Sequence, residues 1–284
     1  MVDDPVQPDP ENDPVFQYLT GQRNASQPAL LAAFEQESVA ALQALRPDRD
    51  IAYGSHPRQC FDLFRAPGAK ATIAYFHAGY WQSRDKEQFH FLAPPLVGAG
   101  FDLAVVNYPL CPDVTMEELM AAARDAIPAV HAFISIGRNE PGRVIAAGHS
   151  AGGHLAVELA LTDWRARGAT REPVAGVVAL SGVYDLQPLI ATPLNEKLRM
   201  TAQMARAASP IFRVRGGMPQ ALFAVGGLET GAFQTQNRNM CAAWQAQGNA
   251  AKALVVDGAD HFSLLRGLTP GAPLFEAVAA LAAG

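Results

Sequence analysis

The sequence has little cysteine and no long apolar run. Its three cysteines, Cys60, Cys111 and Cys241, are too few and too scattered for a disulfide framework, and they lack the spacing of zinc ligands. No apolar run approaches the roughly 20 residues that a membrane-spanning helix needs. We therefore predict a protein of a reducing, cytoplasmic compartment with no membrane partner.

Positive charge is also scarce. The chain has 22 Lys and Arg against 27 Asp and Glu, which gives a net charge of −5. No basic stripe is present, so nucleic acid is not an expected partner. Residues 1–14 contain five acids and four prolines with almost nothing apolar, unlike a secretory signal. We predict that this segment is a flexible tail and that residues 15–284 form a single domain.

Apolar residues, by contrast, make up 49% of the 284 positions, enough for a sizeable core. Short, nearly continuous apolar runs alternate with longer amphipathic segments, which predicts an α/β fold with a mainly parallel sheet and helices on both faces. The predicted strands are 71–78, 102–108, 143–150, 174–182, 220–227 and 251–258, with 50–54 and 60–66 as an antiparallel pair at one edge. The predicted helices are 26–45, 86–98, 115–137, 151–162, 196–207, 231–247 and 273–283.

The sharpest motif is GHSAG at 148–152, which matches G-x-S-x-G between a predicted strand and a predicted helix. Such a turn holds its serine in a strained conformation at a helix N-terminus, and small neighbours let the backbone turn without a clash. A chance match in a glycine-containing loop is the weaker interpretation, because both flanking elements are present. We therefore predict that Ser150 is a nucleophile.

A serine hydroxyl needs a base, and in this architecture the base follows the serine and an acid in the chain. Only His261 follows Ser150 at a distance, directly after the last predicted strand. Glu229, after the preceding strand, is the best candidate for the acid that orients it. Asp185 is the alternative, whereas Asp260 adjoins the histidine and is expected to point elsewhere.

Acyl transfer also requires N–H donors for the developing oxyanion. The residues HAGYW follow the strand at 71–78, where esterases carry such a loop. We predict that the backbone N–H groups of Gly79, Tyr80 and Ala151 form the hole. His77 is expected to brace the loop rather than to transfer protons.

The remaining histidines and cysteines have simpler interpretations. His149 and His154 are five residues apart and do not share a helix face, so packing is preferred to metal binding. Cys111 and Cys241 have no base nearby in the sequence and are expected to be buried apolar residues. We predict that the site needs neither a metal nor a cofactor. His56, His90 and His131 are assigned to the surface or the core.

Together these pieces resemble an α/β-hydrolase, and more narrowly the kynurenine formamidase (arylformamidase) group, from about Pro28 to the C-terminus. The resemblance implies Ser150 as nucleophile, His261 as base and Glu229 as acid. Two positions depart from that group: Ala78 stands where glycine is usual, and Glu229 where aspartate is common. The segments that carry the resemblance are HAGYWQ, NYPLCPDVTMEEL, GHSAGGHLA, LSGVYDLQPL and DHFSLL.

The resemblance implies hydrolysis of a small N-formyl arylamide, such as N-formylkynurenine of tryptophan catabolism, to an arylamine and formate. A carboxylesterase for short acyl esters is the alternative, and a non-catalytic binding protein is disfavoured because the base and nucleophile are both present. Trp81, Tyr80 and Phe262 are placed to form an aromatic wall for the substrate, with ordinary packing as the other interpretation. Arg84 either meets a substrate carboxylate or is a solvated surface arginine. A homodimer is left open.

Overall fold

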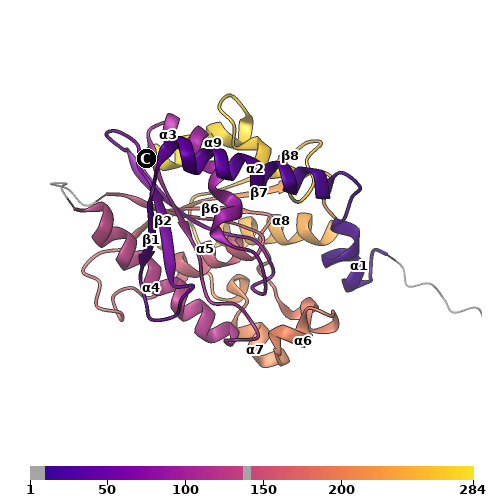
Figure 1. Ribbon diagram of the computed structural model, residues 1–284. Coiled ribbons are helices and arrows are strands. Elements are labelled where there is room, and N and C mark those ends of the chain that lie inside the picture. Colours follow the sequence, from indigo (N-terminus) through magenta and orange to yellow (C-terminus); the bar gives the residue numbers. More distant parts are fainter. Residues whose placement is uncertain (1–9, 137–141) are drawn as a thin grey trace, which may run out of the picture.

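The computed structural model describes residues 10–136 and 142–284 (Figure 1). Its centre is one eight-stranded sheet with the order β1-β2-β4-β3-β5-β6-β7-β8. Strand β2 is antiparallel to both β1 and β4, whereas β3 to β8 run parallel. The predicted α/β class and the antiparallel edge pair are thereby confirmed. The strands are β1 Asp48–Ala52, β2 Cys60–Phe64, β3 Ala71–Phe76, β4 Phe101–Val106, β5 Val144–His149, β6 Val174–Leu180, β7 Gln220–Gly226 and β8 Ala251–Val256.

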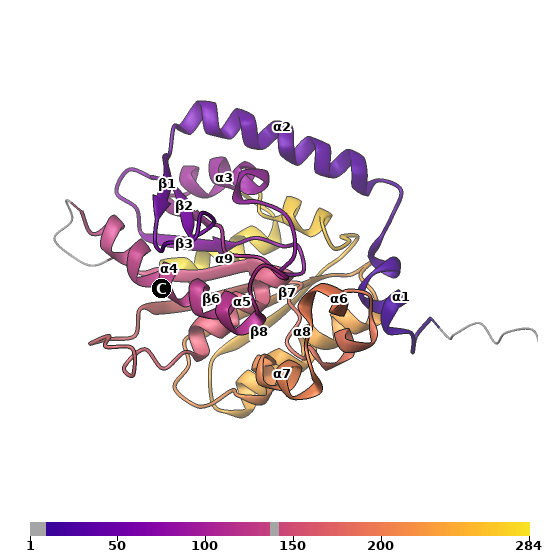
Figure 2. The ribbon, with the colours of Figure 1, turned by 60° about the horizontal axis from the view of Figure 1, so that its bottom comes forward.

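Helices cover both faces of the sheet and enclose two apolar cores. Helices α2, α3 and α9 pack on one face, and α4, α5 and α8 on the other (Figures 1 and 2). Short helices gather with α1 at one end of the sheet (Figure 2). The α-helices are α1 Pro14–Tyr18, α2 Gln27–Leu45, α3 Ala93–Gly98, α4 Met116–Ile134, α5 Ala151–Leu161, α6 Asn195–Leu198, α7 Ala202–Ala207, α8 Gly231–Ala246 and α9 Pro273–Ala283. The 3-10 helices are η1 Thr20–Gln22, η2 Lys86–Leu92, η3 Gln187–Ala191, η4 Pro210–Phe212 and η5 Ser263–Gly267.

The central strands are apolar on both sides because each side packs against helices. In β3 every residue is buried, and successive side chains enter opposite cores. Strand β8 is the exception, since it lies at the edge of the sheet and Val255 is 51% exposed. The prediction that all six apolar runs are covered on both faces is therefore wrong for β8.

Two predicted helices are broken, each for a local reason. Over 86–98 the chain forms η2 and then α3, because Pro94 and Pro95 have no N–H and fit only the first turn of a new helix. Over 196–207 it forms α6 and α7. Arg199 between them has the left-handed φ of 51°, and the Thr201 hydroxyl accepts from Met204 N at the start of α7.

Helix α1 attaches the N-terminal segment to the rest of the chain. Residues 1–9 of the predicted tail, and residue 137 of a predicted helix, lie outside the described residues. Helix α1 begins at Pro14, with the Asp13 carboxylate accepting from Val15 N. The Gln17 side chain accepts from Ala232 N at the start of α8, so α1 is fixed against that helix. Across the described ranges, the structure has no helix of the length and apolar character needed to cross a membrane.

The strand order places six loops at one edge of the sheet. The order reverses at β3, which has β4 on one side and β5 on the other. Because β3 to β8 are parallel, the loops that follow them leave from the same edge. Ligand sites of open α/β sheets form at this edge beside the strand where the order reverses. Every residue that the sequence nominated for chemistry lies in one of these loops or in the helix that follows it.

Candidate active site

Ser150 occupies a strained turn between β5 and α5. Its backbone has φ 57° and ψ −116°, a conformation that a non-glycine residue adopts only under constraint. A Cβ atom at Gly148 would lie 2.2 Å from the carbonyl oxygen of Gly152, and one at Gly152 would lie 1.8 Å from that of Phe76. Both glycines of the motif are therefore required by close backbone packing, as a nucleophile elbow demands.

His261 and Glu229 are brought together from the loops after β8 and β7. Their atoms Nδ1 and Oε2 are 2.7 Å apart, and both side chains are almost fully buried. The other carboxylate oxygen of Glu229 accepts from the Ser181 hydroxyl and from Gly226 N. The carboxylate is thus fixed in place, and His261 Nδ1–H donates to it while the ring nitrogen Nε2 is left to accept a proton.

Asp185, the alternative acid, forms its hydrogen bonds with residues other than His261. The Asp185 side chain accepts from Gln187 N at 3.0 Å and organises its own turn. Asp260 accepts from Phe262 N and Ser263 N, and from the Asn24 side chain, so it shapes the loop that carries His261. Of the acids weighed from the sequence, Glu229 is the one against His261.

A second imidazole packs beside the candidate base. The rings of His149 and His261 are 4.6 Å apart between centroids, and His149 is fully buried. Burial lowers the pKa of His149 well below its usual value. His149 is therefore a neutral packing group at neutral pH, and the preference for packing over metal binding agrees with its position. The described residues form no group of three or more metal-ligating side chains.

The loop after β3 has three successive residues with positive φ. Gly79 has φ 128°, and Tyr80 and Trp81 have left-handed values of 49° and 60°. A Cβ atom at Gly79 would lie 2.2 Å from the carbonyl oxygen of Ser83, so only glycine fits there. Ala78 is buried and is absent from the positive-φ positions, which explains why a side chain is tolerated where the resemblance implies glycine.

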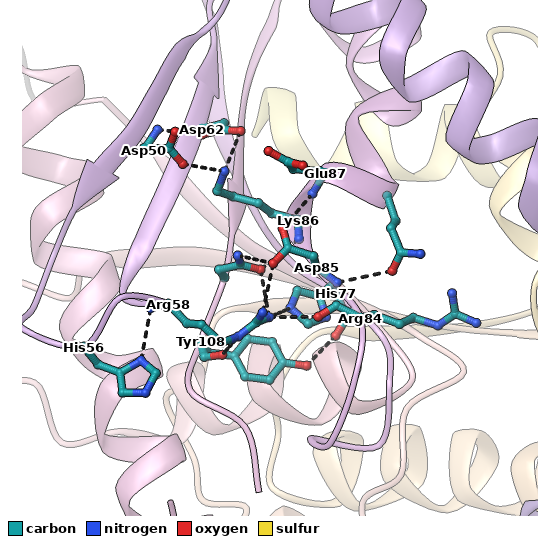
Figure 3. A network of polar contacts seen from close by, with 12 residues as sticks. Asp50, His56, Arg58, Asp62, His77, Arg84, Asp85, Lys86, Glu87 and Tyr108 are labelled. Atoms are coloured by element: carbon teal, nitrogen blue, oxygen red, sulfur yellow. Dashed lines mark hydrogen bonds and ion pairs between the residues drawn. The ribbon is translucent and has the colours of Figure 1, made fainter. Parts of the chain in front are cut away.

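One arginine, Arg58, stabilises this loop through several hydrogen bonds, and it precedes β2 (Figure 3). Its guanidinium donates to the main-chain oxygens of Tyr108 and Arg84, each at 2.9 Å. It also contacts the side chains of Asp85, Asn107 and His77, at distances that are each 3.3 Å or less.

His77 completes the brace. It is fully buried between the parallel rings of Tyr108 and Phe89. Burial lowers the pKa of His77 to about 4, so the ring is neutral at pH 7. Its Nδ1 lies 2.7 Å from the carbonyl oxygen of Ala78, and its Nε2 faces Arg58. A neutral ring with the proton on Nδ1 satisfies both contacts, as expected of a bracing residue.

Ser150 and His261 share a pocket of about 320 Å³. Its walls come from the loop after β3, the segment from α1 to α2, the start of α6 and the loop after β8. Besides Ser150 and His261, the lining residues are Tyr18, Leu19, Gln22, Arg23, Gln27, Ala78, Gly79, Tyr80, Gln82, Ser83, Arg84, Leu194, Lys197 and Phe262. Of the three predicted oxyanion donors, Gly79 and Tyr80 are lining residues of this pocket. Ala151, the first residue of α5, is buried and is not a lining residue.

The predicted aromatic wall is only partly formed. Tyr80 and Phe262 line the pocket, whereas Trp81 does not. The Trp81 side chain is fully buried and packs edge-on against His154 at 5.1 Å between ring centroids. The placement of Trp81 in the wall is thus corrected: it supports the oxyanion loop from the core, because the left-handed turn at residues 79–81 directs its ring away from the pocket.

The remaining histidines and cysteines occupy structural positions. His154 and His131 face the carbonyl oxygens of Ala208 and Pro173 at 2.8 and 2.7 Å. Cys111 and Cys241 are buried, and burial raises the pKa of Cys111 to about 11, so its thiol stays protonated. His90 is buried against Asp62, and His56 accepts from Arg58 N.

The sequence did not predict three residues that support the site, namely Ser181, Asn107 and Arg58. Ser181 and Asn107 directly follow strands, within segments already noted for the resemblance, so their position at strand ends was an available signal. Arg58 gave no such signal, because it lies between the antiparallel strands β1 and β2 and reaches the site only through tertiary packing.

The fold, the serine elbow and the histidine–carboxylate pair define an α/β-hydrolase. A family model of the alpha/beta hydrolase fold matches residues 73–265, and the chain belongs to this family. Kynurenine formamidase of Danio rerio is 30% identical over 230 residues, covering 77% of this chain and 76% of that protein. Kynurenine formamidase of Drosophila melanogaster is 26% identical, with 73% and 72% covered. The protein is a hydrolase that resembles this group of enzymes.

Solved structures agree with the fold. A Silicibacter sp. tm1040 protein, for which thioesterase activity has been suggested, has a TM-score of 0.79 and 28% identity, covering 94% of this chain and 98% of that one. An esterase of Pyrobaculum calidifontis has a TM-score of 0.67 at 19% identity, covering 95% and 96%, a likeness of fold alone.

Proposed function

We propose that this hydrolase cleaves a small N-formyl arylamide, such as N-formylkynurenine, to the arylamine and formate. The observation that carries the proposal is the 2.7 Å contact between Glu229 and Nδ1 of His261, which lines a pocket together with Ser150. The likeness to kynurenine formamidases over about three quarters of the chain supports the substrate class.

In the proposed mechanism Ser150 Oγ attacks the formyl carbon while His261 Nε2 accepts the hydroxyl proton. Glu229 stabilises the imidazolium that results. The carbonyl oxygen becomes an oxyanion, which the N–H groups of Gly79, Tyr80 and Ala151 are proposed to bind. These donors are fixed before the substrate arrives, so no reorganisation is needed in the transition state.

The tetrahedral intermediate then collapses. His261 gives its proton to the aniline nitrogen, the C–N bond breaks and the arylamine leaves. A formyl ester on the serine remains. Water attacks this ester as His261 accepts one of its protons, and the Ser150 oxygen departs with that proton while formate is released. Phe262 and Tyr80, which line the pocket, are proposed to flank the flat aryl group.

Hydrolysis of N-formylkynurenine, followed by the absorbance of kynurenine, tests the proposal. Turnover by the wild type and its loss in Ser150→Ala are the expected results. If the wild type leaves N-formylkynurenine intact but cleaves p-nitrophenyl acetate through Ser150, the hydrolase stands and the formamide substrate is wrong.

A carboxylesterase for short acyl esters is the second candidate, because methylesterases are among the relatives and esterases among the structural neighbours. The same three residues would serve both reactions. The ratio of kcat/KM on N-formylkynurenine to that on p-nitrophenyl acetate separates the two candidates. Labelling of Ser150 by a fluorophosphonate argues against a non-catalytic binding protein.

We also propose that the enzyme acts in the cytoplasm on a small-molecule substrate without a cofactor. The three cysteines are free thiols, as a reducing compartment would leave them. Fractionation of the source cells, together with assay after treatment with a chelator, tests both statements.

A further inference from the structure

Three positively charged side chains line the pocket around Ser150, and none of the residues that line it is acidic. They are Arg84 from the loop after β3, Arg23 before α2 and Lys197 from α6. We propose that Arg84, assisted by Arg23 and Lys197, binds a carboxylate on the leaving group of the substrate. The inference rests on the proposed hydrolase site and narrows its substrate to anionic arylamides.

Arg84 is a cation without a carboxylate partner within the described residues. It is half-buried, and burial lowers its pKa. The acid that acts on it most strongly from a distance, Glu35, accepts instead from the Gln88 side chain. None of the ion pairs formed among the described residues includes Arg84, whereas Arg58 and Arg266 both pair with acids. A partly dehydrated cation gains most from an anionic ligand.

The side chain is also held in place. The Arg84 backbone has the left-handed φ of 74°, and its carbonyl oxygen accepts from Arg58. Figure 3 shows the Arg84 side chain pointing away from the Arg58–His77 network. Its guanidinium carbon lies 4.7 Å from the centre of the Phe262 ring, as in a cation–π contact. The alternative of a solvated surface arginine is therefore not what the structure shows.

The order of groups along the pocket sets the expected selectivity. Phe262 follows the base His261 in the chain, and the Arg84 guanidinium lies over the Phe262 ring. An aryl leaving group beside Phe262 thus directs its substituents toward the guanidinium, while its nitrogen faces His261. Arg23 and Lys197 are exposed, so they attract the anion over distance but contribute less than Arg84. A carboxylate on the aryl ring is favoured, and a neutral group of the same shape is not.

The test compares two substrates of equal shape, 3-formamidobenzoate and 3-formamidobenzamide. For the wild type we expect kcat/KM to be about tenfold higher on the carboxylate, mostly through KM, with the preference shrinking as salt is raised. Arg84→Met should bring the preference close to one, and Arg84→Lys should keep part of it. Arg165→Met, which removes an exposed charge far from the pocket lining, is the matched control and should retain the full preference.

A parallel pair of esters separates this inference from the proposed function. If neither formamide is cleaved but 3-acetoxybenzoate is preferred to 3-acetoxybenzamide through Arg84, formamidase activity is wrong and the carboxylate subsite stands. If the formamides are cleaved without a charge preference, the subsite is wrong and the activity stands. Protection of Ser150 from a fluorophosphonate by 3-hydroxybenzoate, compared with 3-hydroxybenzamide, reports the subsite without turnover. Equal protection by the two would overturn it.

Discussion

The Oε2 atom of Glu229 lies 2.7 Å from Nδ1 of His261, although the two residues stand 32 positions apart, on loops after different strands. Replacing Glu229 by Gln removes the charge that stabilises the imidazolium and allows the wrong tautomer. We expect kcat to fall by about 10⁴-fold, as when the acid of such a triad is neutralised. Steady-state kinetics on p-nitrophenyl acetate measure the change. Asp185→Asn is the control and should retain activity; the reverse ranking of the two variants would identify Asp185 as the acid.

Arg58→Met should impair catalysis without touching the substrate. One guanidinium bonds to five groups around the oxyanion loop, and its loss lets the loop move. We expect kcat to fall by about 10²-fold, the effect of losing one oxyanion donor, with a smaller change in KM. Arg49→Met is the control, because Arg49 forms an exposed ion pair with Glu87 at the start of η2. Equal effects of the two substitutions on kcat would show that Arg58 has no special positioning role.

The close packing at the elbow predicts unequal effects of two neighbouring alanines. A Cβ atom at Gly152 would lie 1.8 Å from the carbonyl oxygen of Phe76, whereas one at Gly153 comes no closer than 3.1 Å to its neighbours. Gly152→Ala should lower the free energy of unfolding by about 3 kcal/mol or more, as overpacking in a rigid site does. Urea unfolding measures both variants. A loss for Gly153→Ala as large as for Gly152→Ala would contradict this account.

Acid should destabilise the fold before its carboxylates are protonated. Burial lowers the pKa of His77 to about 4 and that of His154 below its usual 6.5. Between pH 6.5 and 4 the unfolded chain therefore binds more protons than the folded one, so stability is lost as the pH falls. His77 alone accounts for about 3 kcal/mol. Urea unfolding at pH 7.5 and 5 should show the loss.

His154→Gln provides the control for this pH dependence. The amide has no titration in this range, and its N–H group retains a donor for the carbonyl oxygen of Ala208. The variant should lose less stability than the wild type between pH 7.5 and 5. An unchanged difference would show that His154 does not contribute to the acid sensitivity.

Much of the fold follows from local sequence. Six apolar runs and the short pair at one edge predict the eight strands, and for β3 to β7 the reason is that a strand buried on both faces must be apolar throughout. The prediction is wrong where chain chemistry interrupts the pattern: Pro94 and Pro95 divide the segment 86–98, and the left-handed Arg199 divides 196–207. The exposed face of β8 depends on its place at the sheet edge, which its own residues do not encode.

The site, like the fold, was predicted in part from the sequence and decided in part by tertiary structure. The residue types and order alone nominated Ser150, His261 and Glu229, because a strained elbow needs glycines at fixed spacing and the base must follow the acid in this architecture. The choice of Glu229 over Asp185, the burial of Trp81, the brace formed by Arg58 and the absence of acids from the pocket lining beside Arg84 were decided by tertiary structure. Each depends on distances between segments far apart in the chain, and only the packed sheet and its loops set those distances.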